Sequence, residues 1–421
     1  MHVIQGRVKD YDWGAAHLIP GTFGKPAASF PVAELWLGAH PAGPARCDVD
    51  SRAIALNDAD LAAGEAGRHA RERAASDLRG YIAADPEGTL GADVVNHHGG
   101  QLPYLLKLIA PAKPLSLQVH PSLEQARIGF DREEAAGIDV DAAERSYKDR
   151  NHKPELVYAM TQFEALVGFR TPRRILGVLE GLNTELTDAL AACIRAQPDA
   201  RGVRDAFASL LQEDTRPDAQ AVADVVAACQ NRPADDSPSP RADAIIAKLA
   251  ANYPGDPGAV ASLLLNPVTL QPGEAMFTPA GTVHAYTSGL GLEIMANSDN
   301  VLRAGLTSKY VNVPELLNIV ETVAAPPIRI APERISPIQS THYAPVDDFE
   351  LSIIELRHAN RTASIRGAGP RIILALEGAC ELWTESGQQH VLNTGQAVFV
   401  RADDGKVRAR GFGRFVQADV P

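Results

Sequence analysis

Short runs in which apolar and polar residues alternate, separated by turns rich in glycine and proline, occupy most of the first 170 positions. The clearest runs are VAELWLGAHPAGPA (32–45) and LPYLLKLIAPAKPLSLQVHP (102–121). A period of two, bounded by turn residues, is typical of β-strands. Residues 56–86, which lie between these runs, lack the alternation and favour a well-solvated helix.

The apolar period changes to about 3.6 residues after position 171, as in amphipathic helices. The repeating positions are Val203, Phe207, Leu210 and Leu211, then Val222, Val225, Val226 and Cys229, and finally Ile245, Ile246 and Leu249. Roughly 172–265 is therefore expected to be all-helical. Strand-like runs and turns return after it and continue to the end of the chain.

This last part of the chain contains an internal repeat. LQPGEAMFTPAG (270–281) and LNTGQAVFVRAD (392–403) share Leu, Gly, Ala and Phe at matching positions. Two copies of a strand–turn–strand unit indicate two related β-barrels. Only the first copy runs on into a histidine, in TVHAY, so only the first barrel is expected to hold a site.

The predicted fold is thus mainly β with an α-helical insertion, as two jelly-roll β-barrels plus a helical domain. We expect one barrel to be built from 1–171 and 259–325, with the helical domain over 172–258 between its two parts. A second barrel without a metal site is expected over 326–421.

Composition narrows the possible partners. The formal net charge of −12 argues against a nucleic-acid or anionic-membrane surface, which needs a basic footprint. The four cysteines show no C-x-x-C spacing, which is typical of reduced thiols. We find no apolar signal core at the N-terminus and no run of membrane-spanning length, so a cytoplasmic location is expected.

Gln118 and His120 lie two apart in the strand-like run LSLQVHPS, so their side chains share one face. In a barrel interior they need a hydrogen-bond network or a metal as partner. Strand geometry points further polar residues inward from three other segments: His152, Lys153 and Glu155 in YKDRNHKPELVYAM (147–160), His284 in PAGTVHAY (279–286), and Glu293, Asp299, Arg303 and Lys309 in GLEIMANSDNVLRAGLTSKY (291–310).

Two imidazoles, a carboxylate and an amide oxygen form a ligand set for a divalent ion, and histidine with carboxylate but no thiolate suits catalytic zinc. A single carboxylate leaves the ion a strong Lewis acid. Each residue also has a structural explanation. His120 fits a hydrogen-bonded strand histidine, Arg303 and Lys309 fit surface ion pairs, and Trp13 fits a core residue.

The order of the motifs separates these alternatives. YDWG, ELWLGAHPAGPA, PYLLKLIAPAKPLSLQVHPS, YKDRNHKPELVYA, FEALVGFR, PAGTVHAY and GLEIMANSDNVLRAGLTSKYV follow one another along the chain. In that form the chain resembles the type I mannose-6-phosphate isomerases (phosphomannose isomerases), a cupin family. The resemblance covers roughly 1–170 and 259–325; after 325 only the barrel-like pattern supports it.

The resemblance implies cupin-type barrels and one zinc ion per chain, bound by Gln118, His120, Glu155 and His284. It implies a substrate pocket that includes Lys107, Ser116, Tyr286 and Lys309, to which we add Trp13 of YDWG. The catalytic candidates are His152, Lys153, Glu293, Asp299 and Arg303. The expected activity is the interconversion of mannose 6-phosphate and fructose 6-phosphate through a cis-enediol, feeding mannose and GDP-mannose metabolism, in a monomer.

Roles within this set stay open at the level of sequence. Lys153, with a pKa lowered by nearby positive charges, and Glu293 are competing bases. Arg303 is expected to stabilise or shuttle charge, and His152 and Asp299 to open the sugar ring. Arg303, Lys309, Lys107 and Ser116 are candidates for the phosphate.

Two other classes of function compete with this one. The first is a non-catalytic cupin that binds sugar phosphates. The second is another enzyme on the same scaffold, either an isomerase of a different sugar or a metal-dependent dioxygenase, because the fold alone does not fix the chemistry. Gln118 and the cationic pocket favour a sugar phosphate over the two-histidine, one-carboxylate iron site of oxygenases.

Overall fold

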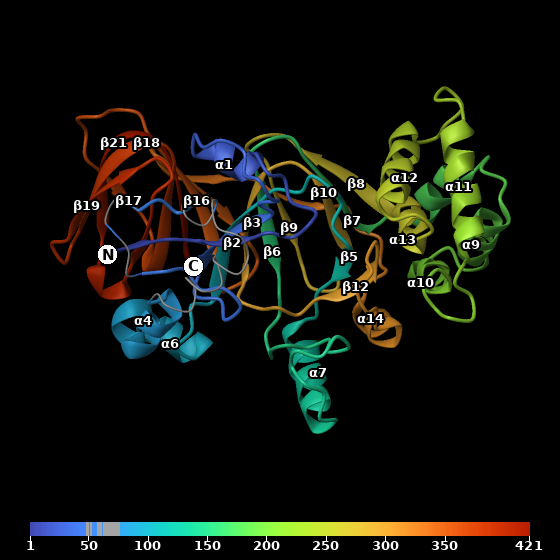
Figure 1. Ribbon diagram of the computed structural model, residues 1–421, viewed down its shortest axis with the longest axis horizontal. Helices are drawn as coiled ribbons and strands as arrows, with labels where there is room; N and C mark the ends of the chain where they lie inside the picture. The colour runs from blue at the N-terminus through green and yellow to red at the C-terminus, as the bar shows by residue number, and fades with distance from the viewer. Residues whose placement is uncertain (48–49, 51–52, 57–60, 62–75) are drawn as a thin grey trace.

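The computed structural model describes residues 1–47, 50, 53–56, 61 and 76–421. Most of the helix expected over 56–86 lies outside the described residues; within that range α4 spans Leu78–Ala84. Figure 1 shows three parts side by side along the long axis: a β-rich part at the left, a central β part, and a group of helices at the right. This arrangement confirms the prediction of a mainly β fold with an α-helical insertion.

Two antiparallel sheets form the central part. Sheet I has the strand order β12 (Leu302–Gly305), β5 (Leu117–Val119), β10 (His284–Ser288), β7 (Phe163–Phe169) and β8 (Leu265–Leu270). Sheet II has the order β13 (Ile328–Ile330), β9 (Ala275–Thr278), β6 (Glu155–Ala159), β11 (Gly291–Ala296), β4 (Tyr104–Ile109), β3 (Glu34–Gly38) and β2 (Arg7–Lys9).

Sheets I and II face each other through a shared apolar cluster. Val157 and Met276 of sheet II pack in this cluster with Phe163, Val268 and Tyr286 of sheet I. Because strand side chains alternate, the polar residues that point to the same side as this cluster meet between the two sheets. The candidate site residues of β5, β6 and β10 lie there.

Sheet III makes up the left-hand part of Figure 1 and packs on the other face of sheet II. Its main path is β1 (His2–Ile4), β20 (Ala397–Val400), β18 (Ala368–Thr384), β21 (Val407–Val420), β16 (Glu350–Leu356), β15 (Gln339–Tyr343) and β14 (Glu333–Ser336), with β17 (Ala363–Ile365) beside β21 and β19 (Gln389–Asn393) beside β18. The Tyr104 hydroxyl joins the two sheets by donating to the Ala418 carbonyl at 2.9 Å.

The two copies of the internal repeat form equivalent turns and strands. Strands β9 and β20 begin at the matched residues Ala275 and Ala397. The matched glycines Gly273 and Gly395 both have positive φ (95° and 81°), a conformation that glycine adopts without strain. Strand pairing also crosses the expected domain boundaries, since the N-terminal β1 pairs with β20 and β13 pairs with β9.

The helical group packs on the outer face of sheet I. It contains α8 (Pro172–Leu179), α9 (Glu185–Ala196), α10 (Ala200–Ser209), α11 (Ala219–Asn231), α12 (Pro240–Asn252) and α13 (Pro257–Ala261). The periodic apolar residues are buried with Leu117, Leu166 and Ala285 of sheet I, apart from Ile245, which is partly buried. Asp218 and Ser239 cap α11 and α12.

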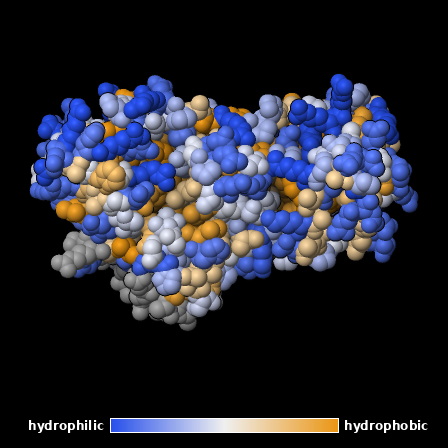
Figure 2. All heavy atoms as spheres, turned by 90° about the horizontal axis from the view of Figure 1, so that it is seen from above, coloured by the Kyte–Doolittle hydropathy of each residue, from blue (hydrophilic) through white to orange (hydrophobic). Residues whose placement is uncertain are grey.

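Further helices surround the sheets: α1 (Leu18–Thr22), α5 (Pro86–Leu90), α6 (Ala92–His98), α7 (Leu123–Ala135) and α14 (Val313–Ile319). In the described part of the chain, no helix combines the length and apolar content needed to cross a bilayer. Figure 2 shows hydrophilic side chains covering much of the helical end, as a solvated surface requires.

Candidate metal centre and active site

Three buried residues converge between sheets I and II. His120 directly follows β5, His284 begins β10, and Glu155 begins β6 in the opposite sheet. The Nε2 atoms of His120 and His284 lie 3.2 and 3.3 Å from the two Glu155 carboxylate oxygens. The three side chains are at most 2% exposed. Their ligand atoms lie within 4.8 Å of one another, a group that suits a metal ion.

The hydrogen bonds of both imidazoles fix which nitrogen faces the centre. His120 Nδ1 lies 2.7 Å from the Asn300 carbonyl oxygen, and His284 Nδ1 lies 2.9 Å from the Thr282 carbonyl oxygen. Carbonyl oxygens only accept, so Nδ1 carries the proton of each neutral ring. In each neutral ring Nε2 therefore presents a lone pair to the Glu155 carboxylate, the orientation that a backbone carbonyl bonded to Nδ1 gives to metal-binding histidines.

The two Nε2 lone pairs and the Glu155 carboxylate are all acceptors, and a bound cation would stabilise them. The buried His120 Nε2 has no hydrogen-bond partner among the described residues. Burial and the charge of Lys153 lower the pKa of His120 to about 4, which keeps the ring neutral. The neutral His120 ring, the His284 ring and a buried carboxylate pointing at one another fit a divalent metal ion.

Gln118 lies beside this group. The register of β5 and β10 places Gln118 directly opposite His284, and the amide nitrogen of Gln118 lies 3.3 Å from His284 Nε2. The nitrogen and oxygen of an amide exchange places by a half-turn, so the oxygen can face the same point. Gln118, His120, Glu155 and His284 are thus brought together.

Charged groups surround the ligands on the cavity side. Lys153 Nζ lies 3.2 Å from Glu155 Oε1, and the Tyr286 hydroxyl lies 3.5 Å from Glu155 Oε2. Further along, Lys107 Nζ pairs with Glu293 at 2.8 Å and approaches Glu34 at 3.9 Å. Burial opposes the charge of Lys107, but the carboxylates of Glu293, Glu34 and Glu155 outweigh it and raise the pKa of Lys107.

A cavity of about 570 Å³ extends from this group toward solvent. Besides the four predicted metal ligands, ten residues were predicted to bind the substrate or to take part in the reaction. Nine of these ten line the cavity: Trp13, Lys107, Ser116, Lys153, Tyr286, Glu293, Asp299, Arg303 and Lys309. Arg303, Lys309 and Lys148 contribute positive charge to its wall. Burial, together with the charges of Arg303 and Lys148, lowers the pKa of Lys309.

His152 is placed differently from the other candidates. It is not among the residues that line the cavity, and its Nε2 lies 2.9 Å from Asp348 Oδ2, in the segment between β15 and β16. This contact joins the central part of the molecule to the C-terminal part. We therefore leave His152 out of the ring-opening proposal below.

Several cavity residues were missed by sequence reasoning. Glu34 accepts a hydrogen bond from Trp36 Nε1 at 2.6 Å, and both line the cavity. Their i, i+2 spacing in ELWLG carried the same signal as Gln118 and His120. Lys148 lies in the YKDRNHK segment, whereas Tyr253 reaches the cavity from the end of the helical group, where no local pattern indicates it.

Comparisons with known proteins agree with this geometry. The family model "Phosphomannose isomerase type I, catalytic domain" matches residues 1–172. Mannose-6-phosphate isomerase of Escherichia coli (strain K12) is 38% identical, and the alignment covers 99% of each chain. Mannose-6-phosphate isomerase 1 of Arabidopsis thaliana is 31% identical over 94% of this chain and 88% of the relative.

Solved structures of phosphomannose isomerases are similar to this chain over its whole length. A variant of phosphomannose isomerase from Salmonella typhimurium superposes with a TM-score of 0.85 at 36% identity, over 100% of this chain and 99% of that one. A crystal structure of mannose 6-phosphate isomerase bound with zinc and yttrium has a TM-score of 0.84 at 36% identity, with the same coverage.

Proposed function

The chain belongs to the type I phosphomannose isomerase family, and from that premise we propose that it is a zinc-dependent isomerase that interconverts mannose 6-phosphate and fructose 6-phosphate. The observation that carries the proposal is the convergence of His120, Glu155 and His284, with unprotonated Nε2 atoms, beside a cavity with a cationic wall. A relative at 38% identity over nearly the whole chain bears the name of this activity.

We propose one zinc ion per chain, held by His120, Glu155, His284 and the amide oxygen of Gln118. When bound, such an ion supplies Lewis-acid stabilisation of negative charge that develops on a sugar oxygen. The protein holds the ligands in place through the Asn300 and Thr282 carbonyls, which fix the imidazole rings.

The proton that moves between C1 and C2 of the open sugar needs a base within hydrogen-bond reach. Glu293 and Lys153 both line the cavity and are the two candidates. Lys107 orients Glu293 through the 2.8 Å ion pair, whereas Lys153 is held by Glu155 at 3.2 Å. Incorporation of solvent protons into the substrate, measured in variants of Glu293 and Lys153, shows which of the two is the base. The base is the residue whose removal abolishes this exchange while the substrate still binds.

Asp299 is the group that we propose for ring opening. It is 37% exposed, lines the cavity, and lies 3.4 Å from His40 Nε2. Burial lowers the pKa of His40 to about 4, and its Nδ1 accepts from the Ala42 N–H at 3.1 Å, so the neutral ring carries its proton on Nε2 and faces Asp299 with a donor. A carboxylate at this position can take the proton of the ring hydroxyl.

The phosphate is proposed to bind at the cationic wall. Arg303, which pairs in register with Gln118, supplies a planar donor fork, and Lys309 and Lys148 add charge. Lys107 and Ser116 lie deeper along the same cavity. Trp13 stacks on Tyr11 with ring centroids 5.6 Å apart and offers an apolar wall to the sugar.

The oligomeric state, the location, the metabolic role and the roles of the domains are proposed as well. We propose a monomeric cytoplasmic enzyme that supplies mannose and GDP-mannose metabolism; its four cysteines are unpaired, as expected for a reducing compartment. We propose that 1–171 and 259–325 form the catalytic unit, that 172–258 supports sheet I, and that 326–421 binds no metal.

The test is a coupled assay that follows fructose 6-phosphate formed from mannose 6-phosphate. Activity that a chelator removes and added zinc restores supports the proposal. A protein that binds fructose 6-phosphate but does not interconvert it with mannose 6-phosphate is instead the non-catalytic binding protein, and turnover of another hexose phosphate alone indicates a different isomerase.

A further inference from the structure

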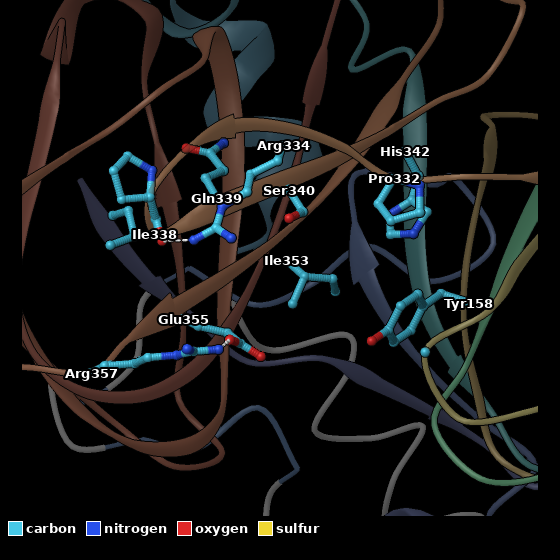
Figure 3. Close-up of a pocket in the computed structure, with 12 residues that line it drawn as sticks. Tyr158, Pro332, Arg334, Ile338, Gln339, Ser340, His342, Ile353, Glu355 and Arg357 are labelled. Atoms are coloured by element: carbon cyan, nitrogen blue, oxygen red, sulfur yellow. Dashed lines mark hydrogen bonds and ion pairs between the residues drawn. The ribbon is translucent and has the colours of Figure 1, made fainter.

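A second cavity, of about 280 Å³, lies between sheet III and sheet II (Figure 3). Tyr158 of β6 and Gly273 of the β8–β9 turn form one wall, and β14, β15 and β16 supply most of the rest. On β6, Val157 packs toward sheet I, whereas Leu156 and Tyr158 pack toward sheet III. Glu155 shares the face of Val157, so the two cavities lie on opposite sides of one strand.

Polar groups face this second cavity. His342 is 2% exposed; the Leu351 backbone interacts with its ring, but neither ring nitrogen has a well-aligned hydrogen-bond partner among the described residues. Its ring lies edge-on to Tyr158, with centroids 5.4 Å apart. In Figure 3 the hydroxyls of Tyr158 and Ser340 point toward the space around Ile353. A buried polar group that is left unpaired destabilises the fold, and a bound ligand removes that cost.

Positive charge exceeds negative charge around the opening. Arg334 is held at the rim by donating to the carbonyls of Ser336 (3.4 Å) and Pro337 (3.0 Å). Arg357 pairs with Glu355 at 2.5 Å. Arg414 lies directly opposite Glu355 in the ladder, and its buried Nε has no partner among the described residues.

Two arginines, Arg334 and Arg357, therefore line the cavity with one carboxylate, Glu355, and Arg414 lies opposite that carboxylate in the ladder, in a chain whose formal net charge is −12. Arginines in this arrangement are suited to a phosphate group, which accepts several hydrogen bonds at once. The cavity is near the lower limit of small-molecule sites, about 300 Å³, which is the size range of a single sugar ring rather than a larger ligand.

We propose that this cavity is a second binding site for a phosphorylated sugar, with the phosphate at Arg334 and Arg357. The sugar hydroxyls bind Tyr158, Ser340 and His342. The site is separate from the metal centre and does not depend on the isomerase activity.

Calorimetric titration of the full-length protein with glucose 1-phosphate tests the proposal. The Arg357→Gln variant removes one proposed contact with the phosphate, at a residue that is largely exposed. The Tyr158→Phe variant removes one proposed contact with the sugar and changes the side chain only by its hydroxyl group. Arg201→Gln is the matched control, because Arg201 is 76% exposed and pairs with Asp199 two residues away, just as the 73% exposed Arg357 pairs with Glu355. Lys309→Ala marks binding in the metal cavity.

The expected result is a binding event that Arg357→Gln and Tyr158→Phe weaken about fivefold or more, and that Arg201→Gln and Lys309→Ala leave within about twofold. Inorganic phosphate should bind more weakly, because it has no sugar hydroxyls for Tyr158 and Ser340. Loss of all binding in Lys309→Ala, or unchanged binding in Arg357→Gln and Tyr158→Phe, overturns the proposal. Equal affinity for inorganic phosphate overturns the assignment to a sugar.

Discussion

Asn300 connects the two sides of the metal centre, and its replacement by alanine tests how the ligands are held. Its backbone carbonyl accepts the Nδ1–H of His120 at 2.7 Å. Its side-chain oxygen accepts from the backbone of Lys148 (2.7 Å) and Asp149 (3.2 Å), and its amide group donates to the carbonyls of Asp149 and Asn151, both at 2.8 Å. The buried side chain thus ties the segment before Glu155 to the carbonyl that orients His120.

The magnitude follows from these contacts. Two accepted and two donated hydrogen bonds, each worth about 1 kcal/mol net, predict a loss of about 3–4 kcal/mol in the free energy of unfolding of the metal-free protein. Loosening the segment whose carbonyl orients His120 predicts a zinc affinity about 10- to 100-fold weaker, the usual effect of removing a group that supports a metal-binding histidine. Thermal unfolding in chelator and competition with a chromogenic chelator measure the two effects.

Asn266→Ala is the matched control for Asn300→Ala. Its amide donates to the carbonyls of Gly168 (3.1 Å) and Phe169 (2.9 Å), so this variant also loses buried backbone contacts, but none to a ligand-bearing segment. It should lose stability and keep its zinc affinity. The reasoning is wrong if Asn300→Ala binds zinc like the wild type, or if both variants lose zinc affinity equally.

Three further predictions follow from the site and the fold. Glu155→Ala and His284→Ala should each lose bound metal and activity together, as measured by metal analysis beside turnover; full activity after dialysis against chelator contradicts this. Lys309→Ala should mainly raise the KM for the phosphosugar, by about tenfold for one lost charged contact, and an unchanged KM removes it from phosphate binding. Burial raises the pKa of Glu350 to about 7 and that of its strand partner Asp419 well above the usual range, so the two carboxyls stabilise the fold at low pH; the Glu350 part, about 1 kcal/mol after screening, is lost as pH rises from about 4.5 to 7. Glu350→Gln should flatten that part of the stability curve measured by urea unfolding, and an unchanged slope contradicts the assignment.

The helices and the metal ligands were predictable because their signals are local. A 3.6-residue period marks the buried faces of α10 and α11. Gln118 and His120 stand out because a strand with one buried face has no place for unpaired polar groups. Glu155 and His284 needed the motif order, since sheet pairing brings them together from distant segments.

Other features depend on tertiary packing that no local pattern encodes. The short β1, His2–Ile4, carries no indication that its partner is β20 near the other end of the chain. Tyr253 reaches the cavity because α12 ends beside Pro114, whose carbonyl accepts the Tyr253 hydroxyl at 2.8 Å. His152 was expected in the cavity, but its ring lies against Asp348, from a segment distant in sequence, instead.

The central claim is that the buried group of His120, Glu155 and His284 holds a metal ion that the isomerisation requires. The most direct measurement is the initial rate of fructose 6-phosphate formation from mannose 6-phosphate by the wild-type protein, before chelation, after chelation and after zinc is restored. Activity should disappear with the metal and return with about one equivalent of zinc per chain. Full turnover in a protein shown to be free of metal contradicts the claim.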